Sequence, residues 1–239
     1  MVRAVGIGNQ DFEIIRKSQY FYIDKTKFIK ERWETGDHVT LITRPRRFGK
    51  TLAMSMTEQF FSIKYAGRED LFQGLRIWEG ETYREFQGTC PVINLSFANI
   101  KEKDYETARR KICQTLSNLY QEYEFLFDSD ALGERGMRFF KSVSEDMDDT
   151  AATMALHQLS IYLAKYYGKR VIILLDEYDT PMQEAYVNGY WEELVSFTRS
   201  LFNASFKTNP YLERAIMTGI PQIRGLLWFY RGGGFCGPG

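Results

Sequence analysis

The run at residues 171–175 constrains the fold most strongly, because it consists of Val, Ile and Leu alone. A strand with one solvent-exposed face alternates apolar and polar residues, whereas an uninterrupted apolar run is typical of a central parallel strand that is buried on both faces. Further short apolar runs at 39–43, 92–97 and 215–218 are also predicted to be strands. Helical patterns alternate with these runs, which predicts an α/β fold with a mainly parallel sheet flanked by helices.

Four helices are predicted from apolar residues that recur every three or four positions and so place one face toward a sheet. These stripes occupy residues 52–63, 105–123, 156–166 and 191–202. Residues 128–150 are acidic and only weakly periodic, which predicts a loop or an insertion.

Residues 1–38 are predicted to form a preface that packs on a core at 39–220. Within the preface, residues 20–23 are expected to be extended. Asp24 is expected to cap the helix that follows, and Gly36 to end it. No interdomain linker or internal repeat interrupts the chain.

The composition excludes several classes of protein. The chain has 239 residues, of which 44% are apolar, and its 31 basic and 31 acidic residues cancel. This balance excludes disordered and collagen-like chains. Three cysteines without a CxxC pair, and only two histidines, argue against a structural zinc site or a disulfide framework. No apolar run approaches the ~20 residues that a membrane span needs, and we expect no secretory signal because the first ten residues have no long apolar stretch. A cytoplasmic location is therefore expected.

The neutral total conceals an uneven distribution of charge. Residues 1–50 carry 11 basic and 6 acidic side chains, which favours an anionic ligand. Residues 121–150 carry 3 basic and 9 acidic side chains and are expected to form a solvated face or loop. No basic and aromatic stripe indicates nucleic-acid binding.

The first motif lies where the predicted strand 39–43 runs into Arg-Pro-Arg-Arg-Phe-Gly-Lys-Thr, which a helix follows. A Walker A loop requires this strand–loop–helix context, in which backbone N–H groups cradle phosphate. We expect Lys50 to reach the β- and γ-phosphates, Thr51 to ligate Mg²⁺, and Gly49 to allow close approach of the backbone. The predicted nucleotide-binding residues are Arg44, Pro45, Arg46, Arg47, Phe48, Gly49, Lys50 and Thr51.

Two points about this loop stay open. Arg44 stands where the Walker A pattern has its first Gly, and a Gly-Lys-Thr tripeptide also occurs by chance. The arginines at 44, 46 and 47 either contact phosphates or pair with acidic side chains on the surface. We expect a phosphate role for at least one of them.

The second motif resembles a Walker B sequence. The run 171–175 ends in Asp176 and Glu177, which places two carboxylates at the carboxyl end of a buried strand, where open α/β sheets bind ligands. We expect Asp176 to hold Mg²⁺ and Glu177 to polarise the attacking water. The alternative is a helix-capping Asp beside a surface Glu.

The other two predicted strands bear on the same site. The strand 92–97 lies between the two motifs in the chain, and ATPases with a catalytic glutamate have an extra strand between their Walker A and Walker B strands. The strand 215–218 ends in Thr218, a candidate for the catalytic residue that senses the γ-phosphate. A strand-terminal Thr before a turn Gly explains the same pattern nearly as well.

Together these residues resemble the bacterial AAA-ATPase-like P-loop family, whose members often carry a C-terminal domain similar to a PD-(D/E)xK nuclease. The resemblance covers roughly residues 6–220. It implies an ATP-binding and ATP-hydrolysing P-loop NTPase module of the AAA-like type, and Arg44 in place of Gly follows the family pattern. The matching segments are 10–12, 20–26, 44–51, 175–179 with Pro181, and 217–220. Residues 20–26 are expected either near the nucleotide base or, as the favoured alternative, in the core.

The resemblance stops after residue 220. Residues 221–239 form an atypical tail that is rich in Gly, and a fifth strand is expected to be missing or replaced by residues 225–231. A truncated or frame-shifted gene is the favoured explanation; a genuine short variant and a cloning artefact are the alternatives.

Three functions fit these motifs. The first is ATP binding and hydrolysis with Mg²⁺, coupled to a conformational switch. The second is a nucleotide-binding regulatory or interaction module with little or no hydrolysis, which the altered C-terminus favours. The third is a phosphotransferase, against which the acidic pair weighs. The expected partner is the nucleotide, and a homo-oligomer or a partner protein stays open.

Overall fold

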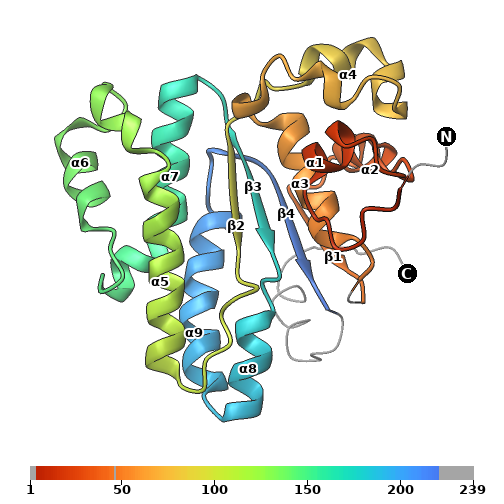
Figure 1. Cartoon of the computed structure of the whole chain (residues 1–239). Coiled ribbons are helices and arrows are strands. Elements are labelled where there is room, and N and C mark those ends of the chain that lie inside the picture. Colours follow the sequence, from red (N-terminus) through yellow and green to blue (C-terminus); the bar gives the residue numbers. More distant parts are fainter. Residues whose placement is uncertain (1–3, 46, 221–239) are drawn as a thin grey trace.

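Four parallel strands form the middle layer of the fold, and helices cover both of its faces (Figure 1). The structure is a computed structural model that describes residues 4–45 and 47–220. The helices and strands follow in the order α1 (Phe12–Lys17), α2 (Lys27–Glu34), β1 (Val39–Thr43), α3 (Lys50–Phe61), α4 (Glu81–Phe86), β2 (Val92–Ser96), α5 (Tyr105–Gln121), α6 (Gly133–Ser142), α7 (Asp149–Tyr167), β3 (Val171–Asp176), α8 (Thr180–Asn188), α9 (Trp191–Phe202) and β4 (Leu212–Gly219).

The run that begins at Val171 forms β3, which is buried at all six positions. Val171, Ile173 and Leu175 pack with the helices α5, α7 and α9. Ile172 and Leu174 pack on the other face with α1, α2 and α3. Because successive side chains of a strand point to opposite faces, a strand covered on both sides must be apolar throughout. The predicted α/β fold with a parallel sheet flanked by helices is confirmed.

The strands lie in the order β1-β4-β3-β2. The strand between β1 and β3 is therefore β4, whereas residues 92–97 contribute the outer strand β2 instead of the separating strand. A crossover through a helix is long enough to carry the chain past a neighbouring strand, so order in the sequence does not set order in the sheet. The strand expected at 225–231 falls outside the described residues.

The prediction of a loop at 128–150 is wrong for much of this segment, whereas the alternative, an insertion, stays a prediction. Residues 133–142 form α6, and α7 begins at Asp149. The two glycines of α6 lower its intrinsic helix propensity, so the sequence does not indicate a helix. Tertiary packing stabilises the helix instead, since Phe140 is buried against Tyr120, with ring centroids 4.6 Å apart. Gly136 lies so close to Tyr162 that an added Cβ would be 3.1 Å from its ring.

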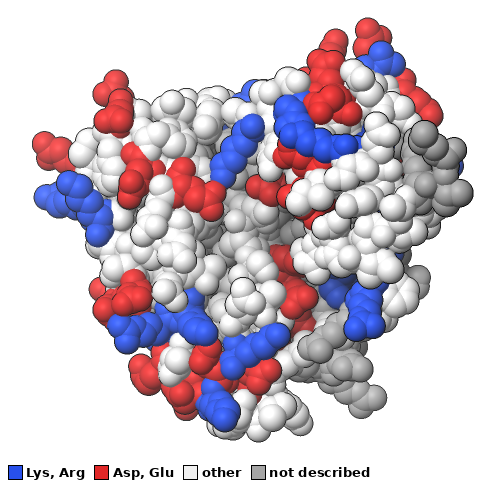
Figure 2. Space-filling view, in the orientation of Figure 1, with Lys and Arg blue, Asp and Glu red and all other residues white. Residues whose placement is uncertain are grey.

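The acidic side chains of this region lie on a solvated face, as expected. Asp148 caps α7 by accepting from the Ala151 N–H at 2.8 Å, and Asp149 pairs with Arg109. Figure 2 shows that acidic and basic side chains are interspersed over the face in view. Within the described residues, no helix is long and apolar enough to cross a bilayer.

The segment between α1 and α2 is anchored by its own polar side chains. The prediction that Asp24 caps α2 is wrong, because Thr26 is the residue at the cap position. The Asp24 carboxylate instead accepts from the N–H and hydroxyl of Thr26, at 2.8 and 2.6 Å, and from the Arg76 N–H at 2.8 Å. Thr26, which is fully buried, precedes α2 and accepts from the Ile77 N–H at 3.1 Å. Gly36 follows the end of the helix with a φ of 76°, so the predicted stop is confirmed.

Tyr22, in the same segment, packs in the core. Its ring lies 5.5 Å from that of Phe12, and its hydroxyl contacts the Met56 sulfur at 3.2 Å. Burial raises the pKa of Tyr22 to about 12. Core packing, the favoured alternative for this residue, agrees with these contacts.

Replacing Thr26 by Val should lower the free energy of unfolding by about 1–3 kcal/mol, because the buried Ile77 N–H loses its acceptor. Urea denaturation followed by tryptophan fluorescence measures the change. The matched control is Thr35→Val at the exposed end of α2, where a change within about 0.5 kcal/mol is expected. Equal stability of the two variants would contradict the anchoring role of Thr26.

Candidate functional site

Three chain segments meet at the carboxyl ends of the strands. The loop 44–49 follows β1, the turn 177–179 follows Asp176 at the end of β3, and Thr218 and Gly219 end β4 between them. A hydrogen bond of 3.3 Å from the Arg44 N–H to the Gly219 carbonyl joins the loop to the end of β4. Because open α/β sheets bind ligands at this edge, the topology brings together the segments that the motifs single out.

The loop enters α3 through Gly49, which has a φ of 74°, in the left-handed region that favours glycine. Lys50 begins the helix and is only 7% exposed. Its Nζ donates to the carbonyl oxygens of Arg44 and Pro45, at 2.8 and 3.3 Å. The loop thus wraps around the Lys50 ammonium. The first-turn N–H groups of α3 lack intrahelical acceptors, so loop and helix together present positive charge to an anion.

The other side chains that the structure describes in this loop face solvent. Arg44, Pro45, Arg47 and Phe48 are exposed. The eleven salt bridges among the described residues include neither Arg44 nor Arg47. The surface ion pairs considered for these two arginines are therefore not found within the described part of the chain. Arg46 lies outside it.

Asp176 ends β3 and is 4% exposed. One carboxylate oxygen, Oδ1, accepts a hydrogen bond from the Thr218 hydroxyl. The other, Oδ2, accepts none from the described residues. A buried carboxylate that is oriented through one oxygen and keeps the other available has the geometry of a ligand to a cation or to water.

Glu177 adopts a φ of 50°, which is unusual for a residue with a side chain. Such a conformation costs about 1–3 kcal/mol and persists where the surroundings enforce it. Here the Glu177 N–H donates to the Thr218 hydroxyl oxygen at 3.2 Å, and its carbonyl accepts from the Thr180 N–H at 3.1 Å. Its carboxylate accepts from the Thr180 hydroxyl at 3.1 Å. The turn therefore sets the direction of the Glu177 side chain.

Thr218 is fully buried and links the two acidic residues. Its hydroxyl donates to Asp176 and accepts from the Glu177 N–H, and its carbonyl accepts from the Tyr178 N–H at 3.1 Å. These contacts position the acidic pair. Direct contact of Thr218 with a γ-phosphate stays a prediction.

Two residues without an assigned role in the sequence analysis also belong to this edge. Asp179 is buried, and its Oδ2 accepts from Gln183 at 2.6 Å and from the Ile220 N–H at 2.8 Å. Gly219 lies so close to the turn that an added Cβ would be 2.7 Å from the Tyr178 ring and 2.8 Å from Asp179 Oδ1. Periodicity gives no signal for either contact, because each joins segments about 40 residues apart.

Lys25 is a third residue that the sequence analysis leaves without a role. It comes from the segment between α1 and α2, yet its Nζ lies 3.6 Å from the position of a Cβ built on Gly49. Only the matching segment 20–26 singles it out in the sequence, because it lies 24 positions before Gly49.

The donor set at this edge fits Mg²⁺. No cluster of three or more His, Cys, Asp or Glu side chains occurs in the described residues. Mg²⁺ in nucleotide sites needs no such cluster, since one or two protein oxygens, phosphate oxygens and water complete its coordination. Asp176, through its available Oδ2, and the Thr51 hydroxyl at the start of α3 are suitable protein oxygens.

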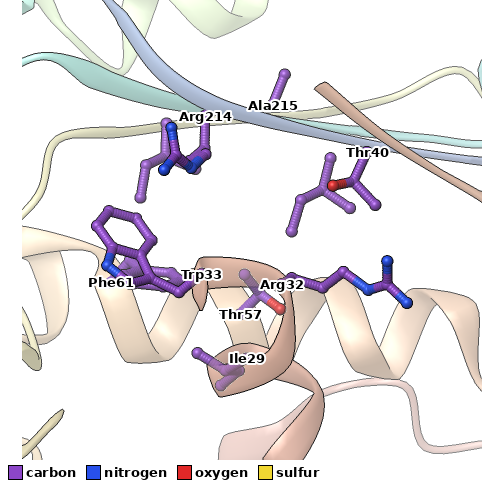
Figure 3. A pocket seen from close by; sticks show the side chains of 10 residues that line it. Ile29, Arg32, Trp33, Thr40, Thr57, Phe61, Arg214 and Ala215 are labelled. Atoms are coloured by element: carbon purple, nitrogen blue, oxygen red, sulfur yellow. The ribbon is translucent and has the colours of Figure 1, made fainter. Parts of the chain in front are cut away.

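A small cavity that is lined by other residues is too small for a nucleotide. It lies between α2, α3 and the strands β1 and β4, and its volume of about 20 Å³ has room for one water molecule. Figure 3 shows Arg214 beside Trp33 and the Arg32 side chain extending away from it, so that the two guanidinium groups lie apart. The Nε atoms of both arginines are buried without a hydrogen-bond partner among the described residues, and a water molecule would satisfy such a donor.

Comparisons with known proteins bear on which family the chain belongs to. The chain is similar to a curated protein of Azotobacter chroococcum mcd 1, "Uncharacterized protein in vnfD 5'region", with 28% identity over 229 residues. The match covers 92% of this chain and 38% of that protein, so the chain spans well under half the length of this relative. No solved structure was found to match. The family model described as "Predicted AAA-ATPase" matches residues 6–225, and the chain therefore belongs to the AAA-ATPase-like family.

Proposed function

We propose that this chain binds ATP with Mg²⁺ and hydrolyses it, and that hydrolysis drives a conformational switch. One observation carries the proposal. The hydroxyl of Thr218 holds Asp176 and Glu177 at the end of β4, next to the loop that wraps Lys50. Family membership supports a nucleotide-binding role at a general level.

The phosphates would lie against the loop 44–49 and the first turn of α3. Lys50 would exchange the carbonyl oxygens of its own loop for β- and γ-phosphate oxygens. Thr51 and Asp176 would hold Mg²⁺, which neutralises phosphate charge when it is bound. Arg44 and Arg47, which are exposed and have no ion pair among the described residues, are available to the same phosphates.

The Glu177 carboxylate would orient a water molecule and accept its proton as the water oxygen bonds to the γ-phosphorus. The bond from that phosphorus to the β–γ bridging oxygen breaks, which releases ADP and inorganic phosphate. The hydrogen bond from the Thr180 hydroxyl and the constrained backbone at Glu177 limit the rotamers of the Glu177 side chain. Such preorganisation lowers the barrier because the base need not reorient during the reaction.

Glu177→Gln should lower ATP hydrolysis by about 10²–10⁴-fold, because the amide cannot accept the proton, while ATP affinity stays within a few-fold of the wild type. Phosphate release and calorimetric ATP binding measure the two effects. Glu192→Gln, at an exposed position on α9, is the matched control and should hydrolyse ATP at the wild-type rate. Equal rates in Glu177→Gln and wild type would remove Glu177 from catalysis.

The same measurements separate this proposal from the non-hydrolysing module. Calorimetric ATP binding by the wild type without phosphate release above background would favour a regulatory or interaction module. Absence of ATP binding by the wild type would contradict both functions.

Thr218→Val should lower turnover by about ten- to a hundredfold and raise the Mg²⁺ concentration needed for half-maximal rate, because Asp176 and the Glu177 N–H lose their shared partner. Valine keeps the volume but leaves buried polar groups unpaired, so unfolding should also become about 1–3 kcal/mol easier. A magnesium titration of the initial rate, with thermal unfolding alongside, measures both changes.

Thr218→Ser is the matched rescue variant, since it restores the hydroxyl. It should recover most of the turnover and the wild-type Mg²⁺ dependence. A valine variant that keeps both properties would show that the hydroxyl does not position the acidic pair.

A further inference from the structure

We propose that Lys25 is a second lysine of the phosphate site, and that its ammonium binds phosphate oxygens of the nucleotide from outside the loop that wraps Lys50. This inference rests on the proposed nucleotide-binding function and adds a residue to it. The proposal places part of the phosphate site in the N-terminal segment, which precedes β1 and the whole Walker A motif.

The first observation is proximity to the phosphate loop. The Lys25 Nζ lies 3.6 Å from the position of a Cβ built on Gly49. Gly49 is the residue at which the backbone enters α3, so the ammonium stands beside the helix start that would face the phosphates. Lys50 occupies the inside of the same loop through its bonds to the Arg44 and Pro45 carbonyls.

The second observation is that Lys25 has no ion pair with any described residue, although three neighbouring lysines do. Lys17, Lys27 and Lys30 each pair with a glutamate four residues away, at 2.6, 3.3 and 3.9 Å. Those exposed pairs contribute little to the stability of the fold, but they show that the neighbouring lysines on α1 and α2 each have a carboxylate partner. The nearest carboxylate along the chain, that of Asp24, is instead committed to Thr26 and Arg76.

The third observation is that the backbone on both sides of Lys25 is held in place. Its own N–H donates to the Tyr22 hydroxyl at 3.3 Å, and Tyr22 packs on Phe12. The next residue, Thr26, is fully buried and bonded to Asp24 and Ile77. An exposed lysine between two anchored residues has its backbone held in place, so only its side chain has to become ordered when the head group meets a ligand.

The fourth observation is the sign of the surrounding charge. Arg44 and Arg47 are exposed on the loop and have no salt bridge with a described residue, and Lys50 begins the helix. Lys25 adds a further cation to this group. Like charges gathered at one place repel one another, and an anion of high charge such as a triphosphate relieves that repulsion. A lysine ammonium, as a compact point charge, suits a phosphate without a fixed hydrogen-bond geometry.

Lys25→Met tests the proposal, because Met keeps the unbranched stem and removes the charge. We expect ATP affinity in the presence of Mg²⁺, measured by calorimetry, to fall about tenfold. Lys27→Met removes a charge two residues away on α2 and should change the affinity less than twofold. Lys25→Arg restores a cation and should recover most of the lost affinity. Thermal unfolding without nucleotide should be the same in the two methionine variants.

The outcomes separate this inference from the proposed function. If the wild type binds ATP and Lys25→Met binds it as tightly as Lys27→Met does, the role of Lys25 is overturned while the proposed function stands. If the wild type does not bind ATP, the proposed function itself fails. A tenfold loss that is confined to Lys25→Met and reversed by Lys25→Arg supports a phosphate-binding charge.

Discussion

The position of β4 between β1 and β3 is the constraint on which the candidate site depends. Through Gly219 the end of β4 accepts a hydrogen bond from Arg44 on one side, and through Thr218 it contacts Asp176 and Glu177 on the other. Without a strand at this place, the basic loop and the acidic turn would have no common support. A parallel sheet provides one because all of its strands end at the same edge.

In the proposed nucleotide site, buried groups would position the acidic pair and exposed cations would contact the ligand. Asp176 and Thr218 are buried and bonded to one another, so the low local dielectric strengthens their interaction and fixes their geometry. Arg44, Arg47 and Lys25 are exposed and have no ion pair with a described residue. A charged ligand can therefore meet the cations without first breaking salt bridges, while the acidic pair stays oriented.

Local patterns predicted the framework of the fold well. The four apolar runs correspond to β1, β2, β3 and β4, and the four helical stripes to α3, α5, α7 and α9, since burial on one or two faces leaves a periodic trace in the chain. The short helix α6 was not predicted, because its glycines and acidic neighbours weaken the apolar periodicity. Its packing is evident only in the tertiary structure, where Phe140 contacts Tyr120 and Gly136 lies close to Tyr162. Asp24 was misassigned because its partner Arg76 lies 52 residues away.

The sequence by itself determined the α/β class, the basic loop after β1 and the two acids after β3, because each depends on neighbouring residues and on the burial of one strand. Only the tertiary structure decided which strand separates the motif strands, that Thr218 bridges the two acids, and that Lys25 reaches Gly49. The contacts of Thr218 and Lys25 join residues that are 24 to 42 positions apart, and the strand order rests on the pairing of β1 with β4, in which Val39 and Ala215 are partners 176 positions apart. Such contacts depend on how crossover helices carry the chain across the sheet, and no local periodicity records that path.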